Sequence, residues 1–78
     1  MPVIKRFSRC RIEMYFGDHN PPHFHVITVD ESRVAVALSD FSIIRGSAKT
    51  RDIAEALEWA KDNGSELITR WIEYTESE

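Results

Sequence analysis

The residues best suited to chemistry stand in one short segment, Asp18-His19-Asn20-Pro21-Pro22-His23-Phe24-His25. Histidine is the side chain whose ordinary pKa lies closest to neutral pH, and its uncharged ring is a common metal ligand. His23 and His25 are two residues apart, so on an extended strand their Cα atoms lie ~6.5 Å apart on one face. Two imidazoles at this spacing can converge on one metal ion or on one reacting group.

The first alternative is a metal site for one divalent transition metal ion. His23 and His25 supply two ligands, and the loop before them supplies a third, either Asp18 or His19. Three protein ligands with one open position are typical of hydrolytic zinc sites. A His-x-His pair is a weak signal when it stands alone.

The second alternative is metal-free chemistry on a phosphate ester such as RNA. His23 and His25 would act as general acid and base, and Tyr15 would join them as a catalytic residue. The residues predicted to bind the substrate are Arg11, Arg33, Asp18 and His19. In a third alternative there is no reaction: the loop side chains satisfy the backbone and the histidines complete an aromatic surface cluster.

Hydrophobic periodicity predicts the elements that must position these residues. Alternation over residues 10–16 places Ile12, Met14 and Phe16 on one face of a strand. Further strands are predicted at residues 3–7, 23–29, 33–38 and 41–45. A proline-rich loop joins the strands at residues 10–16 and 23–29, and Asp30-Glu31-Ser32 forms the next turn.

The last third of the chain has helical spacing. Ile53, Ala56, Leu57 and Ala60 mark the buried face of a first helix, and the second has an apolar stripe of Ile68, Trp71 and Ile72. Predicted end signals are Thr50 and Ser65 as N-caps, with Asn63-Gly64 as a left-handed stop between the helices. The prediction is a single α+β domain over residues 1–78: a small antiparallel sheet of three to five strands, with a C-terminal helical hairpin packed on one face.

Strand phase decides where the histidines point. The predicted pairs are Met14 with Val26, Phe16 with Phe24, Tyr15 with His25, Val26 with Val36, and His25 with Ala37. This register turns the valines toward the helices and the imidazoles away from them. His23 then lies at the loop mouth beside Gly17, and the small side chains of Ala35 and Ala37 leave a shallow surface open to a ligand.

Composition limits the function classes. The 78 residues include 10 basic and 13 acidic side chains, giving a net charge of −3, which argues against tight nonspecific binding to nucleic acid. The charges are uneven: residues 1–16 sum to +3 and residues 52–78 to −6. We expect a cytoplasmic protein without a membrane segment, because no apolar run approaches ~20 residues and Cys10 is the single cysteine.

The segments Met14-Tyr15-Phe16-x-Asp18-His19-Asn20-Pro21-Pro22-His23-Phe24-His25-Val26 and Ala56-Leu57-Glu58-Trp59-Ala60 resemble a bacterial family of unknown function, numbered forty-one sixty. The resemblance implies a small cytoplasmic protein, encoded beside a second short protein and suspected of belonging to a toxin–antitoxin pair. Its motif positions are Asp18, His19, Pro21, Pro22, His23 and His25. The chain departs from its relatives near the end of the first helix, where a histidine is common and Asp62-Asn63-Gly64 stands here.

Two hypotheses for function follow. In the first, the protein is the toxin-like, RNA-directed component of such a pair and acts through the His23/His25 face. In the second, it is a non-enzymatic interaction module, an antitoxin or adaptor, that binds its partner through the same face or through an edge strand. The expected partners are the co-encoded small protein and, under the first hypothesis, RNA.

Overall fold

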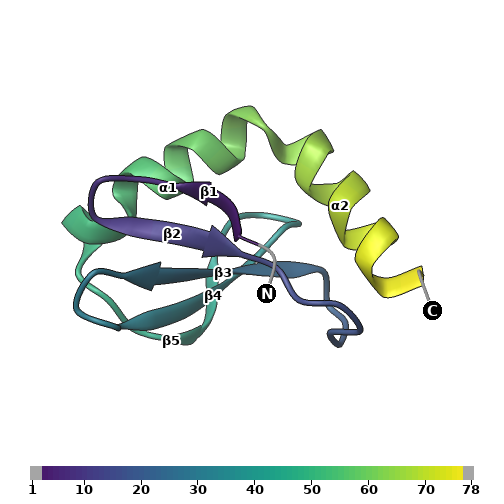
Figure 1. Ribbon diagram of the computed structural model, residues 1–78, viewed down its shortest axis with the longest axis horizontal. Coiled ribbons are helices and arrows are strands. Elements are labelled where there is room, and N and C mark those ends of the chain that lie inside the picture. The colour runs from purple at the N-terminus through teal and green to yellow at the C-terminus, as the bar shows by residue number, and fades with distance from the viewer. Residues whose placement is uncertain (1–2, 77–78) are drawn as a thin grey trace.

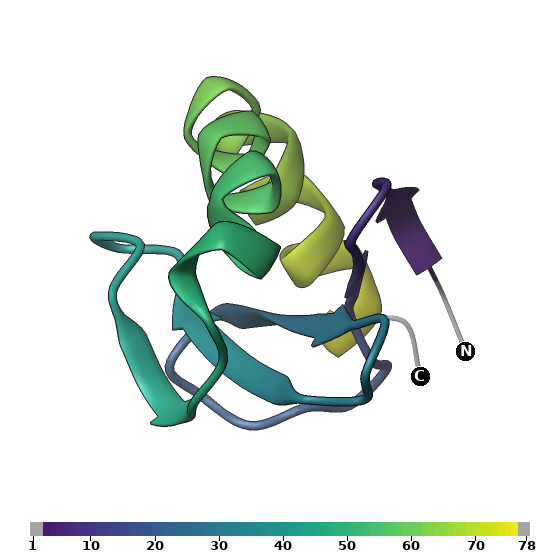
Figure 2. The ribbon, with the colours of Figure 1, turned by 90° about the vertical axis from the view of Figure 1, so that its left-hand side faces the viewer.

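The computed structural model describes residues 3–76, which form five strands followed by two helices. The elements are β1 (Val3–Arg6), β2 (Cys10–Glu13), β3 (His23–Thr28), β4 (Arg33–Ala37), β5 (Ile43–Gly46), α1 (Thr50–Asp62) and α2 (Gly64–Glu76). The strands make one antiparallel sheet in chain order. Figure 1 shows α1 above this sheet and α2 descending at its right-hand end, and Figure 2 shows α1 above the central strands, with the end of α2 reaching the level of the sheet. The predicted α+β fold is confirmed.

The core lies between the sheet and the helices. Alternate strand residues face the helices, because successive side chains of a strand point to opposite faces. The buried apolar residues include Ile12, Met14, Phe24, Val26, Val34, Val36, Ile53, Ala56, Ala60, Leu67 and Trp71. Each large apolar side chain buried in this way stabilises the fold by about 1.5–3 kcal/mol. The predicted phase of the strands is therefore right.

The pairing of β2 with β3 differs from the prediction by two residues. Ile12 pairs with Val26 and Glu13 with His25, where the sequence suggested Met14 and Tyr15. β2 ends at Glu13, and Phe16 is 62% exposed instead of packing opposite Phe24. A shift of two residues leaves every side chain on its original face, so alternation cannot detect it.

The pairing of β3 with β4 is displaced in the same way. Val26 pairs with Val34 and His25 with Ala35, not with Val36 and Ala37. The turn lies one residue earlier than predicted, because Thr28 closes it: its N–H donates to the Ser32 carbonyl over 2.9 Å. The Thr28 hydroxyl also donates to the Asp30 carboxylate inside the turn. Local polar bonds of the turn, more than side-chain alternation, therefore fix this register.

The helix ends differ from the predicted signals. The N-cap of α1 is Lys49 and makes no side-chain cap bond, so Thr50 is the first helical residue and not the cap. α2 begins at Gly64, one residue before the predicted cap Ser65. Asn63 has φ −124° and is not left-handed, because the chain passes almost directly from one helix into the next. Its amide Nδ2 donates to the Trp59 carbonyl at 2.8 Å and satisfies the end of α1 instead.

The two helices meet end to end in an open arch in Figure 1, so they do not fold back side by side as a tight hairpin. Over residues 64–75 of α2, the buried residues are Leu67 and Trp71. Ile68 and Ile72, predicted to share the apolar stripe, are 37% and 46% exposed. The buried face of α2 is thus rotated by about one residue from the predicted stripe. The reason is that the end-to-end arrangement of the two helices sets which side of α2 meets the sheet. In the part of the chain described here, neither helix is long and apolar enough to cross a membrane.

Candidate functional site

The loop between β2 and β3 is held beneath the C-terminal half of α2, as Figure 1 shows at the right of the molecule. Gly17 has φ +70°, a conformation that favours glycine, and its N–H donates to the Tyr74 carbonyl over 3.1 Å. The ring of Phe16 packs on that of Tyr74, with centroids 4.5 Å apart. These contacts place Asp18 over the first residues of β3.

Asp18, His23 and His25 form a compact cluster. One carboxylate oxygen, Oδ2 of Asp18, lies 3.1 Å from Nε2 of His23 and 3.1 Å from Nε2 of His25. The donor atoms of the three residues all lie within 4.8 Å of one another. The side chains of Asp18, His23 and His25 are only 20%, 10% and 18% exposed. The cluster is therefore partly desolvated.

The protons of His23 follow from its partners. Its Nδ1 lies 2.7 Å from the carbonyl oxygen of Pro21, which can only accept, so Nδ1 carries the ring proton. In the neutral ring Nε2 then presents a lone pair, and that lone pair faces the carboxylate of Asp18. His25 can donate its own Nε2 proton to the same oxygen. One acceptor–acceptor contact remains, and a cation or an added proton relieves it.

Asp18 is ionised in this setting. Burial raises the pKa of its carboxyl, but the hydrogen bond from His25, the backbone N–H of His19 and the nearby imidazoles outweigh burial and lower the pKa. The N–H of His19 donates to Oδ1 over 2.9 Å, which leaves Oδ2 free to face the two rings. The loop thus fixes a negative charge against two nitrogen ligands.

Aromatic rings hold the two imidazoles from both sides. His23 packs against Trp71 of α2 with centroids 5.2 Å apart, and His25 packs against Tyr15 at 4.5 Å. His23 pairs with Ala37 and is buried, so the prediction that it lies open at the loop mouth is wrong. The reason is that α2 extends over this end of the sheet. Tyr15 does meet His25, but it reaches the ring from the loop and not from a paired strand position.

A buried carboxylate that the sequence analysis did not single out lies beside the cluster. Glu13 is 1% exposed and accepts hydrogen bonds from Nε of Arg11 (2.6 Å) and from the Tyr15 hydroxyl (2.7 Å). Burial favours a raised pKa for Glu13, but these two bonds outweigh burial and lower the pKa. The Tyr15 hydroxyl also accepts from Nη1 of Arg33 at 3.0 Å. The sequence signal that could have revealed this network was a charged residue, Glu13, on the polar face of β2.

The remaining predicted site residues are less directly placed. Arg11 is engaged by Glu13, and Arg33 by Tyr15, so both arginines support the cluster's neighbours. His19 is exposed, and its side chain is outside the group of converging donors. Cys10 is 4% exposed, and burial raises the pKa of its thiol, so it is a core residue. The loop therefore brings Asp18, and not His19, to the two imidazoles.

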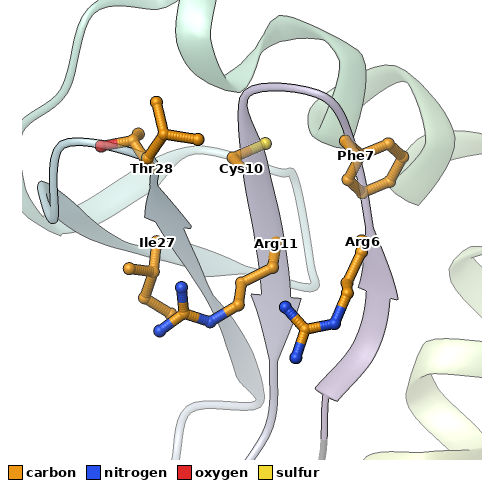
Figure 3. Close-up of a pocket in the computed structure, with 7 residues that line it drawn as sticks. Arg6, Phe7, Cys10, Arg11, Ile27 and Thr28 are labelled. Atoms are coloured by element: carbon orange, nitrogen blue, oxygen red, sulfur yellow. The ribbon is translucent and has the colours of Figure 1, made fainter.

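Hollows on the described surface include two beside the sheet. One, of about 120 Å³, lies along the β1–β2 hairpin and β3, and Figure 3 shows Arg6 and Arg11 extending to one side of it while Phe7 and Cys10 lie on the other. The second, of about 290 Å³, borders the cluster directly through His25. It is lined by His25, Arg33, Val34, Ala35, Arg45 and Gly46. Only the second hollow shares a residue with the Asp18–His23–His25 cluster.

Comparison with known families now identifies the chain's relatives. The family described as Domain of unknown function (DUF4160) matches residues 10–72. The chain belongs to this family. The matched region of DUF4160 contains the whole cluster, its loop and Trp71. No curated protein and no solved structure gives a significant match.

Proposed function

We propose that this DUF4160 protein binds one divalent transition metal ion through Asp18, His23 and His25. The observation that carries the proposal is the facing pair of acceptors: Nε2 of His23 and Oδ2 of Asp18 lie 3.1 Å apart while the ring proton is held at Nδ1 by Pro21. A metal ion between them turns a repulsive contact into two bonds.

The dimensions suit such an ion. Ligand bonds to zinc are about 2.0–2.2 Å long for imidazole and carboxylate donors, so two ligands of a tetrahedral centre lie ~3.3 Å apart. Each Asp18-to-histidine separation of 3.1 Å is close to that edge. The bond from His23 to the Pro21 carbonyl also matches the usual arrangement in which a ligating histidine is oriented through its other nitrogen.

Two histidines and one carboxylate leave a coordination position open. This donor set is used by catalytic zinc centres and by non-haem ferrous centres, where the open position takes water or substrate. At a zinc ion the bound water loses a proton near neutral pH and becomes a nucleophile. A hydrolytic role is thus within reach of the three residues.

The test measures metal content and affinity on untagged protein. After chelation and dialysis, native mass spectrometry with added Zn²⁺, Co²⁺ or Ni²⁺ is expected to show one ion per chain. Titration calorimetry is expected to show affinity reduced by at least about tenfold in Asp18→Asn, His23→Ala and His25→Ala. His19→Ala is the matched control, because it removes a histidine of the same loop whose side chain lies outside the cluster.

Trp71 supplies a second measurement. Its ring packs on that of His23, so binding of Cu²⁺ or Ni²⁺ is expected to quench its fluorescence, and Trp59→Phe leaves Trp71 as the reporter. Stoichiometry near zero in the folded wild type, or equal affinity in wild type and His23→Ala, contradicts the metal site.

A second candidate is the RNA-directed, toxin-like role in a two-protein pair. Arg33 donates to the Tyr15 hydroxyl, and the Tyr15 ring packs on that of His25. A guanidinium, a phenol and an imidazole therefore lie together next to an open hollow, which supports this role. Such groups bind and cleave phosphodiesters. We expect His25→Ala to keep its fold and lose RNA cleavage or growth inhibition.

The interaction module is the competing outcome of the same assay. β5 is exposed along its whole length, and Ile43 and Ile44 are each 45% exposed on this edge strand. Tight binding of the co-encoded protein without RNA cleavage by the isolated chain would support the module and reject the RNA-directed role.

A further inference from the structure

A row of three residues crosses the polar face of the sheet beside the cluster. His25 pairs with Ala35, and Ala35 pairs with Arg45, on the adjacent strands β3, β4 and β5. Neighbouring strands lie ~4.8 Å apart, so the Cα atoms of His25 and Arg45 are about 10 Å apart with only a methyl group between them. The hollow of about 290 Å³ lies in this gap.

Two arginines border the hollow. Arg45 forms one wall, and Arg33 lies two residues before Ala35 on the same face of β4. Among the side chains that the structure describes, neither arginine forms an ion pair, whereas Arg9, Arg11 and Arg70 each do. The hollow therefore concentrates positive charge that no described carboxylate contacts directly.

The backbone is shaped to bring the arginines together. Gly46 has φ +81°, and a Cβ at this position would lie 2.2 Å from the Arg33 carbonyl oxygen. Glycine allows the last residue of β5 to approach β4 this closely, which holds Arg45 beside the start of β4. Any larger residue would have to displace one strand from the other.

We propose that this hollow binds the phosphoryl group of a small phosphorylated ligand. The two guanidinium groups match the charge and the several acceptor oxygens of a phosphate. The volume is at the lower end of ligand pockets, which run from about 300 to 1,000 Å³. It holds a phosphate with a small attached group and leaves the remainder of a longer ligand outside.

The phosphoryl site goes beyond the metal site and does not depend on it. His25 belongs to both, since its Nε2 faces Asp18 while the residue also lines the hollow. A metal ion in the cluster would add positive charge beside the bound phosphate. Measurements on metal-free and metal-loaded protein therefore separate the two proposals.

The experiment is a titration of chelator-treated protein with inorganic phosphate, adenosine monophosphate and a 5′-phosphorylated hexaribonucleotide. The same oligonucleotide with a 5′-hydroxyl end distinguishes a terminal phosphate from the RNA backbone. We expect Arg45→Ala and Arg33→Ala to weaken phosphate binding at least tenfold. Arg51→Ala is the matched control, because it removes one exposed arginine from α1 with the same change in charge.

Ala35→Leu is a second variant that changes no charge. Its larger side chain fills the floor of the hollow, so it is expected to abolish binding; circular dichroism checks that it folds. Equal weakening by Arg45→Ala and Arg51→Ala overturns the proposal, because it shows nonspecific charge attraction. Phosphate binding that persists while metal titration fails rejects only the metal site. Metal binding without any phosphate binding rejects only the hollow.

Discussion

The two faces of the sheet are buried in different ways. The face under α1 and α2 is apolar, and Phe24, Val26 and Val36 are fully buried there. The opposite face also contains buried residues, but they include Glu13 and are covered by the chain's own β2–β3 loop and by long side chains such as Tyr15. Helices cover one face, whereas a polar network covers only part of the other and an open hollow lies beside it.

This difference bears on the proposed site. Burying apolar side chains under helices stabilises the fold directly. Burying a carboxylate is unfavourable unless it is fully bonded, and replacing a buried ion pair by apolar residues is often neutral or stabilising. On the polar face, the burial of Glu13, Asp18 and two histidines therefore lowers the stability that an apolar surface would give. An arrangement of this kind favours a role in binding or catalysis.

The largest expected effect comes from the helix-covered face. Phe24→Ala removes a fully buried ring and should lower the free energy of unfolding by about 3–5 kcal/mol. Urea denaturation monitored by circular dichroism measures it. A loss below 1 kcal/mol would show that the two faces do not differ in the way described.

A smaller effect is expected at Glu13. In Glu13→Gln the amide NH₂ group faces Arg11 or Tyr15, both of which donate to Glu13 in the wild type, so one hydrogen bond is lost. The free energy of unfolding at pH 7 should fall by about 1–3 kcal/mol. The folded-state pKa of Glu13 is lowered from 4.5, so its contribution is present above that value and is lost as pH falls through the folded pKa. Wild type should therefore lose stability on acidification below about pH 4.5. The variant should lose less, because it lacks the Glu13 carboxyl. It should still lose some stability, because Asp18 still titrates. Identical pH profiles for the two proteins would contradict the assignment.

The smallest effect tests the register of the first hairpin. Phe16 is 62% exposed and touches Tyr74, so Phe16→Ala should change the free energy of unfolding by about 1 kcal/mol or less. The pairing predicted from sequence, with Phe16 opposite Phe24, would require a loss as large as that of Phe24→Ala. Parallel measurement of the two variants decides between the two registers.

Much of the site could be predicted from the sequence, but its third member and its surroundings could not. The i, i+2 spacing of His23 and His25 already places both on one face of β3. The choice of Asp18 over His19 depends on how Gly17 docks the loop on Tyr74. The contact of His23 with Trp71 likewise joins residues far apart in the chain, and local periodicity carries no information about such pairs.

By itself the sequence determined which residues of the central strands and of α1 face the core, because strand alternation and helical spacing are local properties of the chain. It also determined the membership in DUF4160 and the location of the histidines. Only the tertiary structure decided the two-residue strand offsets, the buried network around Glu13 and the hollow between His25 and Arg45. A shift by two residues preserves every face while changing every neighbour, so those pairings become fixed only when loops and helices pack together.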